Sequence, residues 1–215
     1  TSGIFIYDSK GNLRTRQITT SSKKFSDCTK MLIRFLAPAD VKGTSLLVYD
    51  YDSQSDNQWI YMPALRKVRR ILSAEKGKNF MGSEFTNADM GKPNLQDYVY
   101  VNLGTAELDG KKCWKIEAKC KNEDIQHENG FSRKIMYIDQ GNYLAYRIEY
   151  FDLTGKLQRI QTNSGYKKMS GNSYFAFHMV MENVQNGRKS EMKVDKFQTG
   201  SKLSENAFSP NVLDK

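Results

Sequence analysis

The stretch KCWKIEAKC, residues 112–120, decides the fold class of this chain. Apolar and polar side chains alternate along it, and the apolar positions are Trp114, Ile116, Ala118 and Cys120. Successive side chains of a β-strand point to opposite faces. This period of two therefore predicts a strand with one buried face and one face in water.

The same alternation recurs along the chain, at residues 144–150, 175–181 and 192–194, and residues 3–7 also have the composition of a strand. Short turn signals separate such stretches, namely Gly11-Asn12, Asp109-Gly110, Gln140-Gly141-Asn142, Thr154-Gly155 and Asn186-Gly187. Gly and Asn tolerate the positive φ of tight hairpin turns. We therefore predict an up-and-down antiparallel meander in one domain, residues 1–215, rather than a parallel βαβ sheet.

Three segments depart from this pattern. Residues 77–97 are rich in Gly, Asn and Asp, and residues 86–89 resemble a helix capping box, which predicts a loop with a short helix. Residues 201–208 predict one helical turn near the end of the chain. Residues 63–72 leave two interpretations open: the apolar spacing fits a helix, whereas the turn proline Pro63 fits the return arm of a hairpin.

Charge and hydropathy limit the class of protein. The chain has 215 residues and a formal net charge of +9, with a pI near 9.3 and a mean hydropathy of -0.66. No apolar stretch approaches the roughly 18 to 20 residues that a membrane-spanning helix needs. The positive charge favours anionic partners such as phospholipid headgroups, nucleic acid or an acidic protein, or it coats the outer face of a sheet.

The three cysteines are too few for a disulfide framework. Cys113 and Cys120 belong to one predicted strand and lie roughly 23 Å apart, so they do not bridge each other. A disulfide between Cys28 and one of them remains open. We expect Cys120 on the apolar face of its strand and Cys113 on the polar face, exposed among lysines.

The chain contains no recognisable catalytic or nucleotide-binding motif. His127 lies in a segment with the composition of a turn, and His178 is opposite the apolar face of its strand; together they lack a third metal ligand. A basic cluster, residues 66–70, resembles a nucleic-acid site, but the aromatic residues mostly share faces with Ile, Leu and Met. We expect no enzyme activity, metal, cofactor or nucleic-acid partner, although catalysis by Cys113 or His127 is the alternative to test.

The apolar and aromatic strand surface exceeds what one or two short helices would cover. A sandwich, a closed barrel or a curved sheet around a ligand would each solve this problem. Periodicity alone leaves an ordinary packed core as an equal alternative to a ligand cavity.

Several stretches together identify a family resemblance. They are residues 33–35 (IRF), 38–44 (PADVKGT), 59–70 (WIYMPALRKVRR), 80–85 (FMGSEF), 114–117 (WKIE), 149–152 (EYFD) and the closing residues 203–213. The chain resembles the outer membrane lipoprotein-sorting protein family, which is related to the carrier LolA. The likeness covers nearly the whole chain.

The resemblance implies an α+β, mainly β fold: a curved antiparallel meander that forms an open half-barrel, with short helices as a lid. It favours the hairpin for residues 63–72. It also implies a periplasmic carrier in a Gram-negative bacterium that shields lipid or lipoprotein acyl chains on their way to the outer membrane. Family members carry a lid helix before the first strand, and we expect this helix to be missing from the chain.

The resemblance leaves the partner open between a lipoprotein exporter and an inner-membrane, lipid-exporting permease of the RND type. The alternative function is a non-carrier adaptor or accessory protein of such a permease. Peripheral membrane contact is compatible with either.

The predicted ligand-binding residues are Leu46, Val48, Trp59, Tyr61, Phe80, Met81 and Phe85. We expect the segment with Phe80, Met81 and Phe85 to cover Trp59 and Tyr61. Arg66, Arg69 and Arg70 are the predicted contacts to an anionic headgroup or to the permease. Ordinary core packing is the alternative for each apolar residue.

Overall fold

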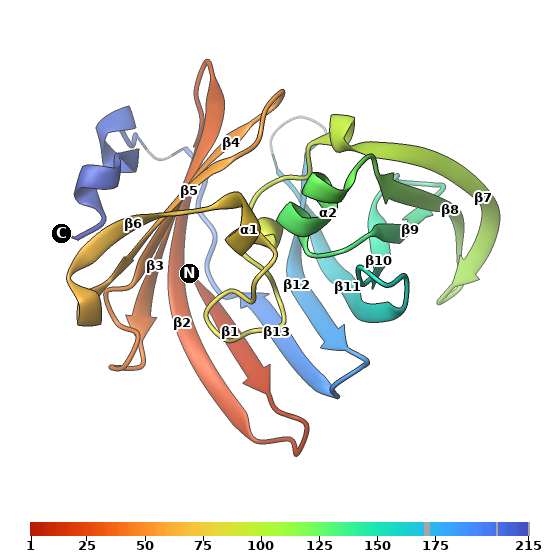
Figure 1. Ribbon diagram of the computed structural model, residues 1–215, viewed down its shortest axis with the longest axis horizontal. Helices are drawn as coiled ribbons and strands as arrows, with labels where there is room; N and C mark the ends of the chain where they lie inside the picture. Colours follow the sequence, from red (N-terminus) through yellow and green to blue (C-terminus); the bar gives the residue numbers. More distant parts are fainter. Residues whose placement is uncertain (170–172, 201, 215) are drawn as a thin grey trace.

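The strands pair into one curved antiparallel sheet in a computed structural model, which describes residues 1–169, 173–200 and 202–214. Within these residues the sheet has thirteen strands in the order β6-β5-β4-β3-β2-β1-β13-β12-β11-β10-β9-β8-β7. The first and last strands of this order, β6 and β7, do not pair, so the sheet stays open and its two halves curve toward each other (Figure 1).

The first half of the sheet is a meander of consecutive hairpins. Its strands are β1 (Ser2–Tyr7), β2 (Leu13–Lys24), β3 (Cys28–Ala37), β4 (Ser45–Tyr51), β5 (Asn57–Met62) and β6 (Lys67–Ile71). The predicted hairpin at residues 63–72 is confirmed, because β5 and β6 pair antiparallel around a short 3-10 helix, η1 (Pro63–Leu65).

The second half is a second meander. Its strands are β7 (Tyr98–Leu108), β8 (Lys111–Cys120), β9 (Arg133–Asp139), β10 (Ala145–Phe151), β11 (Leu157–Lys168), β12 (Tyr174–Asn183) and β13 (Arg188–Val194). The last strand pairs with β1, with Ile4 opposite Met192, and this seam joins the two meanders. The predicted mainly β, open half-barrel is therefore confirmed, with one crossover from the β6 edge to the β7 edge.

Residues 72–97 make that crossover, and we call them the lid segment (yellow in Figure 1). They contain α1 (Ser73–Lys76) and the 3-10 helices η2 (Ala88–Met90) and η3 (Leu95–Asp97). The predicted capping box is present, because Asp89 accepts from the Thr86 backbone N–H at 2.8 Å and the Thr86 hydroxyl accepts from Asp89 N–H at 3.2 Å. The face of the sheet that the lid segment covers is the inner face.

The second helix, α2 (Glu123–Asn129), connects β8 to β9. It contains His127, which we predicted to lie in a turn. α1 and α2 lie side by side across the inner face (Figure 1). Their ends touch through two glycines, since a Cβ on Gly130 would lie 2.9 Å from the Gly77 carbonyl oxygen. The buried Lys76 ammonium is 2.5 Å from Glu128 Oε1, so an ion pair also joins the two helices.

The opposite, outer face of β3 to β6 is covered by residues 203–214, the C-terminal strap, at the left of Figure 1. The strap contains η4 (Glu205–Phe208) and η5 (Pro210–Val212); residue 201, where we predicted a helical turn to begin, lies outside the described residues. Phe208 and Leu213 are buried against Leu32 and Leu47. The Tyr49 hydroxyl donates to the Phe208 carbonyl oxygen at 2.6 Å.

All three cysteines are free and buried. The prediction of an exposed Cys113 is wrong: its side chain is fully buried between Ala106 and Asp139 on the adjacent strands, whereas the neighbouring Trp114 is 37% exposed. Burial raises the pKa of the Cys113 thiol, which disfavours the nucleophilic thiolate.

The contact between Gly77 and Gly130 gives a stability test. Gly130 has a φ of +76° and Gly110 a φ of +75°, but a Cβ on Gly110 meets nothing within 4 Å. We expect Gly110→Ala to cost about 1 kcal/mol for the left-handed backbone alone. Gly130→Ala should cost about 2 kcal/mol or more, because the methyl group also separates α1 from α2. Equal losses in urea unfolding would contradict the close helix contact.

Candidate functional site

The inner face beneath the lid segment is filled by the protein's own side chains. Phe80 is 1% exposed and packs with Leu46 and Val48, and its ring centroid is 5.7 Å from that of Phe35. Phe85 enters an adjacent cluster with Tyr98, Phe131 and Tyr150. The lid segment is thus an apolar plug at this end of the half-barrel.

A buried polar network also holds the lid segment down. Arg159 of β11 donates to Asp89 Oδ2 at 2.6 Å and to the Glu84 carbonyl oxygen at 3.2 Å. The Glu84 carboxylate is 2.8 Å from Arg188 Nε, and its backbone N–H donates to the Ser190 hydroxyl at 2.9 Å. No motif in the sequence pointed to these residues, because the partners lie about 70 to 106 positions apart.

Beyond the lid segment, the inner face of the second half is apolar and only partly covered. Directly opposite residues of paired strands share a face, and Ile116, Met136 and Ile148 are opposite one another on β8, β9 and β10. Two residues further along the same strands, away from the lid segment, Trp114 is opposite Ile138. We call these residues, with Met179 of β12, the open inner surface: Trp114, Ile116, Met136, Ile138, Ile148 and Met179.

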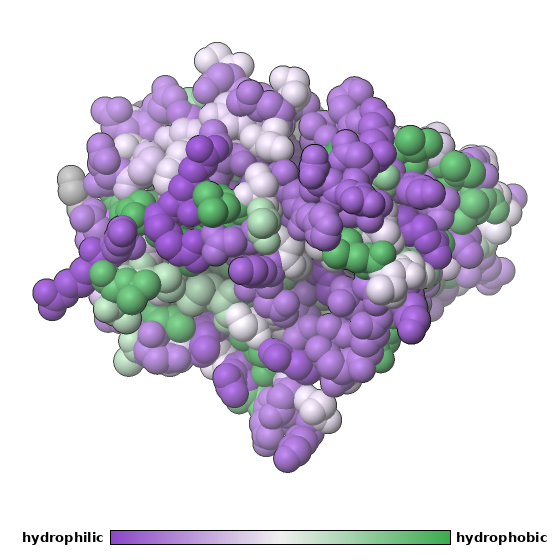
Figure 2. All heavy atoms as spheres, in the orientation of Figure 1, coloured by the Kyte–Doolittle hydropathy of each residue, from purple (hydrophilic) through white to green (hydrophobic). Residues whose placement is uncertain are grey.

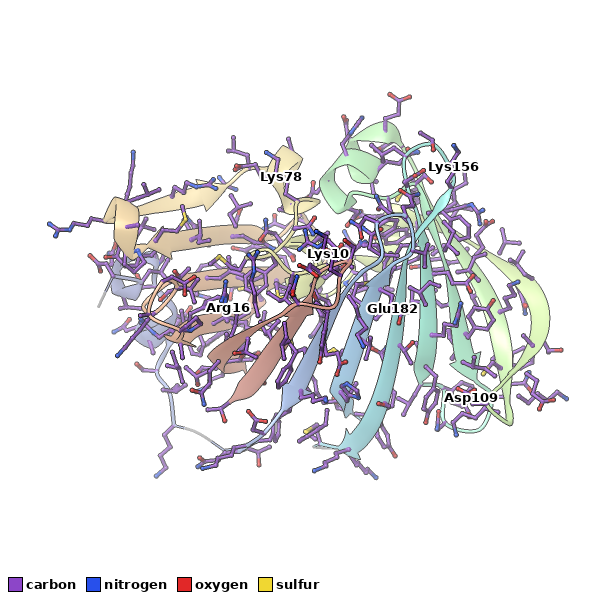
Figure 3. All side chains as sticks on the ribbon, turned by 90° about the horizontal axis from the view of Figure 1, so that it is seen from below. Lys10, Arg16, Lys78, Asp109, Lys156 and Glu182 are labelled. Carbon is purple, nitrogen blue, oxygen red and sulfur yellow. The ribbon has the colours of Figure 1, made fainter. Side chains whose placement is uncertain are left out.

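Burial decreases along the open inner surface with distance from the lid segment. Tyr150 is buried, Ile148 is half-buried, and Trp114 is 37% exposed. In Figure 3, Lys78 of the lid segment lies near the top of the view, whereas Asp109 at the tip of the β7–β8 hairpin lies at the lower right, far from it. The open inner surface therefore begins under the lid segment and faces solvent at its far end.

The predicted ligand-binding residues divide between the two faces. Leu46 and Val48 are buried on the inner face, where Phe80, Met81 and Phe85 pack with the inner clusters. Trp59 and Tyr61 are on the outer face, beside Leu47 and the C-terminal strap, and the Trp59 ring centroid is 4.9 Å from that of Tyr49. The lid segment therefore does not cover Trp59 and Tyr61, contrary to our expectation.

The predicted headgroup or partner contacts Arg66, Arg69 and Arg70 lie at the β6 edge and are exposed. Arg69 Nη1 is 2.8 Å from Glu75 Oε2 of α1, and Arg70 contacts Asn57 of the neighbouring strand. The basic cluster is thus on the edge opposite β7, away from the open inner surface.

Two shallow hollows lie apart from the open inner surface. One, of about 360 Å³, is lined by Gly3, Phe5, Thr15, Arg16, Gln17, Ala37 and Pro38. The other, of about 400 Å³, is at the β7–β8 hairpin and is lined by Thr105, Ala106, Glu107, Gly110 and Lys112. Both are open to solvent, unlike the clefts that bury most of a ligand's surface in a typical small-molecule site.

In the described part of the chain, no three or more His, Cys, Asp or Glu side chains are placed to hold a metal ion. His178 Nε2 is instead 3.2 Å from Glu191 Oε2 on the next strand. Among the same residues, no helix has the length and apolar composition needed to cross a membrane.

Comparisons with known proteins agree with this geometry. An outer membrane lipoprotein-sorting protein domain from Vibrio parahaemolyticus is 30% identical, with a TM-score of 0.90, and the match covers 100% of this chain and 90% of that one. This chain belongs to the outer membrane lipoprotein-sorting protein family. A family model described as "-like: Uncharacterized protein" also matches residues 27–215.

Two further solved structures support the family fold. A DUF1329 family protein from Desulfovibrio piger is 28% identical, with a TM-score of 0.89, and the match covers 99% of this chain and 89% of that one. A LolA superfamily protein from Nitrosomonas europaea has a TM-score of 0.73 at 16% identity, with 97% and 87% covered, and shows the shared fold alone. The search of curated proteins found no match.

The lid segment also meets the turn between β4 and β5, where carboxylates are crowded. Lys92 of the lid segment donates its backbone N–H to Asp50 Oδ2 at 2.8 Å, and the Ser55 hydroxyl donates to Glu128 of α2 at 3.3 Å. Burial, together with the nearby Asp50, raises the pKa of Asp56 to about 7.

This raised pKa gives a pH test. The folded state keeps a proton on Asp56 that the unfolded state releases near pH 4, so wild-type stability should fall as the pH rises from about 4 to about 7. We expect Asp56→Asn to stabilise the protein more at pH 8 than at pH 5. Its effect on the free energy of unfolding should be about 1 kcal/mol or more larger at pH 8. The exposed Asp195→Asn is the control. An Asp56→Asn effect that is equal at both pH values, measured by urea unfolding, would contradict the assignment.

Proposed function

We propose that this protein is a carrier that binds lipid or lipoprotein acyl chains on the open inner surface, for transfer towards the outer membrane. The observation that carries this proposal is a half-buried apolar surface on the inner face of an unclosed sheet. Each CH₂ group that an acyl chain removes from water contributes about 0.8 kcal/mol. The side chains of Met136 and Met179 suit varied chain shapes, because methionine is flexible and polarisable.

Opening of the lid segment would give this carrier a larger ligand-binding surface. Phe80, Met81 and Phe85 leave the inner face if the lid segment opens, and Leu46 and Val48 then become available to the ligand. Leu46 and Val48 would then line the inner end of the path, and Phe80, Met81 and Phe85 would contact the ligand from the lid segment. Trp59 and Tyr61 would anchor the C-terminal strap instead of touching the ligand.

We place the carrier in the periplasm, as the names of its relatives suggest, and assign it no catalytic step. Transfer needs only a downstream acceptor with higher affinity for the acyl chain, so neither a cofactor nor an energy source is required on this chain. The exposed cluster Arg66, Arg69 and Arg70 is the candidate contact for an anionic headgroup or a partner exporter or permease.

A second candidate function is a cargo-free adaptor of an RND-type inner-membrane lipid transporter. The β7 edge favours it, because Val99, Val101 and Leu103 are exposed on this edge strand, which pairs with β8 on one side only. Figure 2 shows apolar side chains gathered at this right-hand edge of the molecule. Natural edge strands are usually protected by charge or proline, and this strand has neither at these positions.

Charged substitutions separate the two functions. We expect Ile116→Glu or Ile148→Glu to reduce the uptake of a fluorescent fatty acid at least ten-fold, because the carboxylate would face the acyl chain on the inner face. Val101→Glu, on an exposed site of the other face, is the matched control and should bind like wild type. Uptake that survives Ile116→Glu and Ile148→Glu would contradict the carrier site, whereas loss of transporter binding in Val101→Glu alone would favour the adaptor.

The outer-face residues give a separate prediction. We expect Trp59→Glu to lower the free energy of unfolding by about 2 to 4 kcal/mol, because it removes the large apolar contact beneath the C-terminal strap. Fatty-acid uptake by the folded fraction should remain within two-fold of wild type. A loss of uptake without a loss of stability would contradict this prediction and indicate that Trp59 contacts the ligand.

A further inference from the structure

Two buried cations lie on the inner face at the covered end of the open inner surface. Lys134, Tyr150 and Arg159 are directly opposite one another on β9, β10 and β11, so their side chains share this face. Lys134 is 6% exposed and Arg159 4% exposed. Paired strands are about 4.8 Å apart, which places the two positions roughly 10 Å from each other.

Lys134 has no hydrogen-bond or ion-pair partner among the described residues. Its ammonium group lies 4.8 Å from the ring centroid of Tyr98 and 5.6 Å from that of Phe131. Burial lowers its pKa, and Asp89 is the one carboxylate close enough to oppose this effect. A buried ammonium group held only by aromatic rings is costly, and an anion beside it would offset that cost.

The guanidinium group of Arg159 makes only some of the hydrogen bonds that it could donate. One nitrogen donates to Asp89 and to the Glu84 carbonyl oxygen, while Nη2 is buried without a hydrogen-bond partner. Its guanidinium group lies 4.7 Å from the ring centroid of Tyr150. Arg159 therefore keeps a free donor on the same face as Lys134.

The charges around these two groups do not balance. The network contains three cations, Lys134, Arg159 and Arg188, against the carboxylates of Glu84 and Asp89. Burial raises the pKa of the nearby Cys120 thiol to about 11, so the thiol adds no negative charge at neutral pH. With Lys134 protonated, the network therefore carries one positive charge more than its two carboxylates neutralise.

Lys134 lies on the same strand and the same face as two residues of the open inner surface. Met136 follows Lys134 by two residues on β9, on the same face, and Ile138 follows by four, about 13 Å along the strand. An amphiphile with its head at Lys134 would therefore lay its chain along Met136 and Ile138 toward the exposed Trp114.

The carboxylate now nearest to both cations belongs to the lid segment. Asp89 is in η2, and its carboxylate also accepts from the Thr86 backbone N–H, so it would move away with the lid segment. Opening would leave Arg159 without its carboxylate partner and Lys134 without a carboxylate nearby, at the inner end of an apolar path.

We propose that Lys134 and Arg159 form a headgroup site for an amphiphile with one negative charge, a carboxylate or a phosphodiester, and that Asp89 occupies this site when the lid segment is closed. This inference rests on the proposed function and adds the ligand class. It favours a free anionic lipid over cargo whose acyl chains end in a neutral group.

The test compares ligands that differ in charge but share a chain. Oleate and oleyl alcohol compete against the neutral fluorescent probe N-phenyl-1-naphthylamine on wild-type protein and on Lys134→Met, Asp89→Asn and the exposed control Lys119→Met. Wild type and Lys119→Met should bind oleate roughly 10- to 100-fold more tightly than oleyl alcohol, as a charge-assisted bond predicts. Lys134→Met should bring this ratio close to one through a loss of oleate affinity, and Asp89→Asn should raise the ratio.

A second pair of ligands distinguishes the two anions. Lysophosphatidylglycerol and lysophosphatidylcholine both contain a phosphodiester, but only the first has a net negative charge. A charge preference for both oleate and lysophosphatidylglycerol supports a general anion site, and a preference for one of them identifies its headgroup.

The outcomes separate this inference from the proposed function. Binding of oleate and oleyl alcohol with equal affinity would overturn the headgroup site and leave the acyl-chain carrier intact. An oleate preference that persists in folded Lys134→Met, with stability checked by urea unfolding, would also overturn it. Binding of none of the four ligands would overturn the carrier itself.

Discussion

A single sheet has two faces to cover, and this chain has few residues outside the strands to cover them. The lid segment fills the inner face of the first half and, together with α2, the near end of the second half, and the C-terminal strap fills part of the outer face. Nothing comparable reaches the far end of β8, β9 and β10 among the described residues, so Trp114, Ile116 and Ile148 stay partly in water. Apolar surface left uncovered in this way marks a binding site more often than a defect.

The contacts of the lid segment suit an element that closes reversibly. A purely apolar plug would resist opening in proportion to its buried area. Here Phe80 and Phe85 supply that burial, while Asp89 and Glu84 bind arginines for which an anionic ligand could compete. The contact between Gly77 and Gly130 holds the first residues of the lid segment against α2, so that motion would be confined to the residues after Gly77.

Local alternation and turn chemistry predicted many of the strands and hairpins and the position of the lid segment, whereas the hairpin at residues 63–72 was predicted from the family resemblance. The sequence did not decide which face each residue takes in β4 and β5. Leu46, Leu47 and Val48 are consecutive and all buried, since both faces of β4 are covered, and a strand without alternation does not reveal its orientation. Trp59 and Tyr61 were therefore assigned to the wrong side of the sheet. Lys134 and Arg159 were missed because the residues that bury them, Tyr98, Phe131 and the lid segment, are distant in sequence.

Paramagnetic broadening of methionine methyl NMR signals by a spin-labelled stearic acid tests the central claim most directly, since the nine methionines sample both covered and open positions. Binding on the open inner surface predicts that Met136 and Met179 broaden first and most strongly. Met31 and Met62, at the first half of the sheet, should stay sharp until the lid segment opens. Broadening that is uniform across all methionines, or confined to Met31 and Met62, would contradict the account.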